Sequence, residues 1–118
     1  MSDFTILHVD DVEKSGNWLL ARRSLGLAAF GMNIVDIAPG DQIPEHDETE
    51  RDQEEVFMVV SGSPSIFIEG EAHELTAGSL ARLDPELTRT VRNTGSGPAR
   101  VLIVSAPRSS GYEPLEWA

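Results

Sequence analysis

GDQIPEHDETERDQEEVFMVVSG, residues 40–62, joins a turn to an acidic segment and then to an alternating apolar run. Similar short apolar runs, separated by Gly, Pro, Asp and Asn, continue on both sides of it. Runs of this kind at roughly 8–12-residue spacing are typical of β-sandwiches and closed β-barrels. The pattern therefore predicts an all-β chain.

Strands are expected wherever an apolar or alternating run lies between turn residues. They cover Phe4–Val9, Trp18–Arg22, Leu27–Phe30, Met32–Ala38, Glu55–Ser61, Ser65–Glu69, Ala72–Leu75, Ser79–Leu83, Arg89–Arg92 and Ala99–Ala106. No window favours a long amphipathic helix. The 118 residues suit one domain. We expect N-terminal strands and a dimer contact in residues 1–30, a barrel in 31–106, and a tail in 107–118 that packs on the barrel or on a partner subunit.

Charge and composition exclude several classes of function. The chain has 20 acidic and 9 basic residues, a net charge of −11, which disfavours nucleic-acid and membrane binding. It has no cysteine, so disulfides, thiolate nucleophiles and cysteine-based zinc sites are excluded. The N-terminus lacks the pattern of a secretory signal, and no apolar run is long enough to cross a bilayer. A cytoplasmic location is expected by elimination.

Two segments resemble the paired motifs of the cupin superfamily. In the first, Gly40 precedes His46 by five intervening residues, and Glu55 precedes Gly62 by six. The second motif, G-x5-P-x-G-x2-H-x3-N, is matched in spacing by Gly78, Asp84, Glu86, Arg89 and Asn93. The resemblance implies a single-domain cupin barrel, which is a double-stranded β-helix or jelly roll.

The resemblance also implies where a metal centre is altered. In metal-dependent cupins, three histidines and one glutamate hold a divalent ion. This chain keeps His46 and Glu55, but it has Arg89 at the third histidine position. A guanidinium cannot bind a metal, because it has only donors and stays protonated; it can pair with a carboxylate. The second histidine position stays open among Glu48, Glu50, Arg51 and Gln53.

Strand alternation places candidate side chains on common faces. If Glu55 faces the interior of the barrel, Phe57, Val59 and Ser61 do so as well. The predicted ligand pocket is therefore formed by His46, Glu48, Glu55, Phe57 and Arg89. Alternation leaves the face of Arg82 open.

Two functions follow from these residues, and the sequence leaves open whether the chain is an enzyme. The first is binding of a small polar or acidic metabolite without a cofactor, with Arg89 in place of the metal. The alternative is a metal-dependent dioxygenase, isomerase or epimerase that holds manganese or iron with His46, Glu48 and Glu55. A homodimer is expected in either case, because exposed sheet edges and an aromatic tail need cover.

Overall fold

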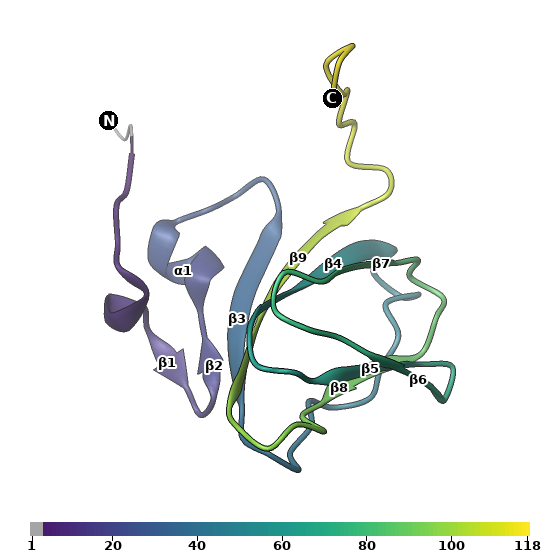
Figure 1. Ribbon diagram of the computed structural model, residues 1–118. Helices are drawn as coiled ribbons and strands as arrows, with labels where there is room; N and C mark the ends of the chain where they lie inside the picture. The colour runs from purple at the N-terminus through teal and green to yellow at the C-terminus, as the bar shows by residue number, and fades with distance from the viewer. Residues whose placement is uncertain (1–3) are drawn as a thin grey trace.

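The computed structural model describes residues 4–118, and it has two antiparallel β-sheets that enclose one apolar core (Figure 1). The larger sheet has the strand order β1-β2-β3-β9-β4-β7, and the smaller has the order β6-β5-β8. The strands are β1 Lys14–Ser15, β2 Trp18–Leu19, β3 Gly31–Ile37, β4 Gln53–Ser61, β5 Ser65–Ile68, β6 Glu71–Glu74, β7 Leu80–Leu83, β8 Arg89–Arg92 and β9 Ala99–Pro107. The short elements between residues 9 and 25 are a 3-10 turn, Val9–Asp11, and a helix, α1, Ala21–Leu25. The prediction of an all-β, single-domain fold is confirmed.

The core forms where the two sheets face each other. Alternate side chains of β4 are buried from Gln53 to Val59, as strand geometry requires. Aliphatic side chains and one aromatic ring from both sheets complete a single cluster: Val35, Ile37, Ile43, Phe57, Ile66, Leu83, Val91, Val101 and Ile103. The prediction that Ser61 faces inward is wrong, because a register shift between Val59 and Ser61 ends the alternation and leaves Ser61 exposed.

Residues 38–52, which connect β3 to β4, are hydrogen-bonded along β8 although they form no regular strand. Ile43 N donates to Val91 O at 3.0 Å. His46 N donates to Arg89 O at 3.0 Å, and Arg89 N donates back to His46 O at 2.8 Å. His46 is therefore held by the smaller sheet, whereas Glu55 belongs to the larger one.

Asn93 shows what the last position of the second motif does in this chain. Its side chain is buried and donates to Ile37 O at 2.7 Å and to Gly97 O at 2.8 Å. Its Oδ1 accepts from Gly95 N at 3.0 Å. The amide thus closes the turn before β9 and fixes it to the end of β3.

The strand predictions from Met32 onward are confirmed, and the three before it differ from the structure. Phe4–Val9 forms no strand, and Val9 begins the 3-10 turn. Trp18–Arg22 is a strand only at Trp18–Leu19 and then turns into α1. Gly26 ends α1 in the left-handed conformation and donates to two helix carbonyls. Leu27–Phe30 is irregular and leads into β3.

Both terminal segments leave the sheets and extend toward the same side in the view of Figure 1. Large apolar side chains on them are exposed, including Ile6 at 83% and Trp117 at 85%. The tail after Pro107 is thus largely uncovered by its own barrel. Across residues 4–118, the structure contains no helix long and apolar enough to cross a membrane.

Candidate functional site

A cavity of about 610 Å³ opens beside β4, between the larger sheet and the segment that connects β3 to β4. This volume is within the usual range for pockets that bind small molecules. Apolar and polar side chains both form its walls, and the large apolar ones include Trp18, Phe30 and Phe57. The polar side chains that line it are Arg22, Asn33, His46, Glu48, Arg51, Gln53, Glu55 and Ser105.

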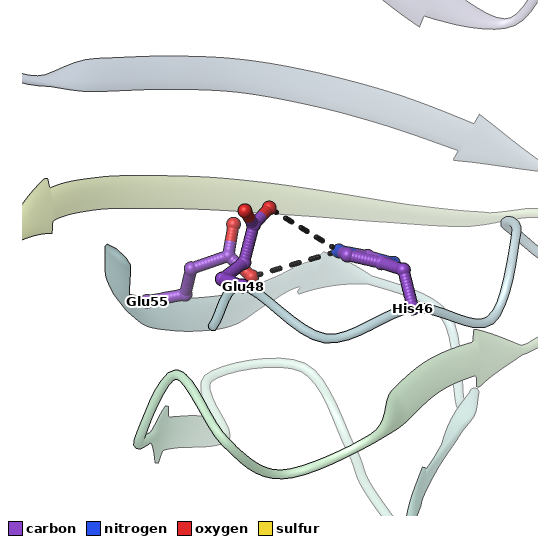
Figure 2. A group of neighbouring side chains, drawn as sticks. All are labelled: His46, Glu48 and Glu55. Carbon is purple, nitrogen blue, oxygen red and sulfur yellow. Dashed lines mark ion pairs between the residues drawn. The ribbon is translucent and has the colours of Figure 1, made fainter. Parts of the chain in front are cut away.

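Three of these polar side chains converge on one point at the base of the cavity (Figure 2). His46 Nε2 lies 3.6 Å from Glu48 Oε1 and 3.8 Å from Glu55 Oε1. One ligand atom from each residue lies within 4.8 Å of the others. His46 and Glu48 are partly exposed to the cavity, whereas the side chain of Glu55 is only 8% exposed.

The orientation of the His46 ring is fixed by a backbone carbonyl. Its Nδ1 lies 2.9 Å from Pro44 O. A carbonyl oxygen only accepts hydrogen bonds, so Nδ1 carries a hydrogen and donates it. In the neutral ring, Nε2 then has a lone pair directed at two carboxylates. Three electron-rich atoms then face one another, and a proton or a cation between them would relieve the repulsion.

Glu55 lies in surroundings that disfavour its charged form. Burial raises the pKa of its carboxyl group above the ordinary value, and this effect exceeds the lowering by Arg89. Glu48 raises the pKa further, and His46 and Arg51 lower it. The Oε1 atom of Glu55 is buried and has no hydrogen-bond partner among residues 4–118. The carboxylate is therefore incompletely compensated by the protein groups around it.

Arg89 lies beside Glu55, as the sequence predicts, but outside the cavity lining. Its side chain is completely buried behind the cavity wall, and it does not line the cavity. The guanidinium donates to Leu87 O at 2.9 Å, to Asp84 O at 3.1 Å and, at 3.4 Å, to Pro85 O. Its Nε lies 3.6 Å from Glu55 Oε1, and neither atom forms a hydrogen bond within the described chain. Arg89 forms no hydrogen bond to Glu55, because its two terminal nitrogens bind the carbonyls of the 84–87 loop.

The structure answers two questions that the sequence leaves open. Of the candidates for the second ligand position, Glu48 joins His46 and Glu55, while Arg51 and Gln53 line the cavity beside them. Glu50 is exposed and lies outside the cavity lining. Arg82 points away from the interior and forms ion pairs with two surface carboxylates, Glu54 at 3.0 Å and Asp84 at 2.6 Å.

Sequence reasoning missed three polar residues of the cavity wall: Arg22, Asn33 and Ser105. Asn33 lies on β3 and Ser105 on β9, two neighbouring strands of the larger sheet, and β9 also borders β4. Each lies two positions from a buried residue on the same strand, so the period of two could have placed it on the inner face. Arg22 comes from α1, and no pattern in the sequence connects it to the motifs.

The donor atoms of the three converging side chains lie close to the spacing that a divalent cation requires. Ligands about 2.1 Å from an ion lie about 3.0–3.4 Å apart at octahedral or tetrahedral angles. The observed separations of 3.6 and 3.8 Å exceed this range by a few tenths of an ångström. One imidazole and two carboxylates suit manganese, iron or zinc.

Comparison with known families now assigns the fold. The sequence model of the cupin domain matches residues 33–105, which is more than half of the chain. The chain is a member of the cupin family. The matched range contains the three converging residues and Arg89. No curated protein matches the sequence.

Solved cupin structures resemble this one over most of its length. A cupin protein from Bacteroides fragilis is 24% identical, with a TM-score of 0.82, over 99% of this chain and 94% of that one. A cupin-superfamily sugar phosphate isomerase from Silicibacter pomeroyi is 21% identical, with a TM-score of 0.73, over 86% and 75%. A predicted oxalate decarboxylase from Thermotoga maritima is 15% identical, with a TM-score of 0.73, over 87% and 99%. At these identities the likeness shows the fold alone.

Proposed function

We propose that this cupin holds a divalent cation with His46, Glu48 and Glu55 and binds a small polar molecule in the cavity next to it. The observation that carries the proposal is the lone pair of His46 Nε2, which faces two carboxylate oxygens at 3.6 and 3.8 Å. A proton on Nε2 would relieve the repulsion, but these distances are too long for good hydrogen bonds. A cation between the three atoms satisfies all of them at once.

Three protein ligands leave coordination positions free for water or for an oxygen of the bound molecule. A cation in this position supplies Lewis acidity, which polarises such an oxygen. The chain's own residues orient the ligands. Pro44 O fixes the tautomer of His46, and strand β4 fixes Glu55.

A metal-free pocket is the second candidate, and the position of Arg89 favours it. This buried cation lies 3.6 Å from Glu55 Oε1 and attracts the carboxylate without a metal. In that case a protonated His46 would link the two glutamates, and the cavity would bind its ligand by polar contacts alone. Against this candidate, neither Glu55 Oε1 nor Arg89 Nε forms a hydrogen bond among residues 4–118, so the pair lacks the contacts that normally accompany a buried ion pair.

Metal binding can be measured directly. Protein stripped with a chelator and then dialysed against manganese, iron(II) or zinc is expected to retain about one equivalent by elemental analysis. Glu48→Gln keeps the size of the side chain but weakens a ligand, so we expect affinity to fall at least tenfold. Glu50→Gln removes the same charge from the same acidic segment outside the cavity, and its affinity should match that of the original protein. No retained metal, or equal losses in both variants, would reject the proposal in favour of a metal-free pocket.

We also propose that the chain forms a homodimer through its terminal segments. Phe4, Ile6, Tyr112, Leu115 and Trp117 are each 63–85% exposed. Apolar surface of this extent usually packs against another molecule. A second copy brings an identical set of exposed side chains, so the two sets can cover each other.

A further inference from the structure

The charge of the cavity is opposite to the charge of the chain. The whole sequence carries −11. Glu48 and Glu55 are the only carboxylates among the described residues that line the cavity, whereas Arg22 and Arg51 line it and Arg89 lies behind its wall. Three guanidiniums thus oppose two carboxylates. If a divalent cation is bound, the excess of positive charge rises to three.

Arg22 and Arg51 also differ from most other arginines of the chain in their partners. Arg23, Arg82, Arg100 and Arg108 each form an ion pair with a carboxylate. Neither Arg22 nor Arg51 forms such a pair with any residue from 4 to 118. Arg22 Nη1 donates to Leu27 O at 3.2 Å, which holds the side chain at the cavity and leaves its other donors available.

Guanidiniums that line a concave site without a carboxylate partner are suited to bind a carboxylate of the ligand, often through two parallel hydrogen bonds. Apolar walls at Trp18, Phe30 and Phe57 offer contact to a hydrocarbon portion.

We propose that the ligand is a small organic acid whose carboxylate binds Arg51 and Arg22 while another oxygen approaches His46, Glu48 and Glu55. This inference rests on the proposed function and names its ligand class. Arg51 and Arg22 are specificity-determining residues, which select acids against uncharged molecules of the same shape.

The test uses the full chain loaded with manganese and freed of excess metal. Malonate, succinate, glutarate, 2-oxoglutarate and lactate are titrated by calorimetry, with malonamide, succinamide and glutaramide as uncharged matches. At least one acid is expected to bind with a Kd below 1 mM, and its amide at least tenfold more weakly. Arg51→Gln and Arg22→Gln should each weaken that acid about tenfold or more without reducing bound manganese. Arg92→Gln, an exposed arginine of β8 outside the cavity, is the matched control and should change neither value.

The outcomes separate the ligand class from the metal site. If manganese binds but none of the five acids binds at 10 mM, or if an amide binds as well as its acid, the organic-acid inference is overturned and the metal proposal stands. If the protein retains no metal but binds an acid through Arg51 and Arg22, the ligand class stands and the metal proposal fails. Equal weakening in Arg92→Gln would also overturn the inference, because it would show a general effect of charge.

Discussion

Replacing Arg89 with lysine separates two roles of this buried side chain. Arg89 attracts Glu55 through its charge, at 3.6 Å, and it donates hydrogen bonds to the carbonyls of Asp84 and Leu87. Lysine keeps the charge. However, one ammonium nitrogen cannot occupy the positions of both terminal guanidinium nitrogens, so at least one carbonyl loses its charged donor. If the charge alone matters, Arg89→Lys is tolerated; if the hydrogen bonds matter, it is not.

The expected cost follows from the two shorter hydrogen bonds, 2.9 and 3.1 Å. Losing one hydrogen bond to a charged donor in a buried site costs about 1.5–3 kcal/mol. We therefore expect Arg89→Lys to lower the free energy of unfolding by about 2–3 kcal/mol. A domain of this size loses about 4 °C in Tm per kcal/mol, which corresponds to about 8–12 °C. Arg89→Met removes both bonds and the charge and should cost about 3–5 kcal/mol.

Urea denaturation of metal-free protein at pH 7, followed by fluorescence, measures these differences. Arg92→Lys, on the exposed side of the same strand, is the control and should lie within about 0.5 kcal/mol of the original protein. An Arg89→Lys variant as stable as this control would refute our reasoning. It would mean that Arg89 acts as a counter-charge and that its contacts to the 84–87 loop contribute little.

Three further predictions concern pH and assembly. Asp36 binds Arg100 through two hydrogen bonds, 2.6 and 2.9 Å, which lower the pKa of the aspartate below its ordinary 3.8. A carboxyl group with a lowered pKa stabilises the fold at pH values above its ordinary pKa, and this stabilisation is lost as the pH falls through the pKa of the folded state. Asp36→Asn should therefore lower the free energy of unfolding by about 0.5–1 kcal/mol at pH 7, a value limited by solvent screening, and by progressively less below pH 3.8. A difference that grows in acid contradicts this prediction. Because the pKa of Glu55 is raised, the metal-free fold should lose stability as the pH rises from 4.5 through the pKa that Glu55 has in the folded state. Glu55→Gln should remove that part of the pH dependence. A variant whose Tm changes with pH as steeply as that of the original protein would refute the prediction. Light scattering should give the mass of a dimer, and Trp117→Ser should shift it toward the monomer; a monomer before substitution excludes the dimer.

The sequence predicted the middle of the fold well because spacing and alternation carry its geometry. The motif spacing from Gly40 to Gly62 identified His46 and Glu55 as site candidates. The period of two in β4 placed Glu55 and Phe57 on the inner face. Those features depend on local backbone geometry, which the residue pattern determines.

The terminal strands and the direction of Arg89 were beyond such reasoning, because they depend on partners distant in the chain. Phe4–Val9 has a suitable composition, yet a strand also needs pairing within a sheet, and neither sheet includes this segment. Alternation indicated that Arg89 is buried, but the carbonyls that its guanidinium binds are set by the conformation of residues 84–87. Likewise, Arg22 reaches the cavity only because α1 folds against β3.

The reciprocal backbone hydrogen bonds between His46 and Arg89 have a mechanical consequence. One candidate ligand is anchored to β8 and another to β4, so the cluster bridges the seam between the two sheets. An ion bound by these residues would link the two sheets to each other. Because the ion would bind the folded state and not the unfolded state, it would raise the free energy of unfolding. Amide hydrogens on both sides of the seam, including those of His46 and Arg89, should therefore exchange with deuterium more slowly as the metal concentration is raised.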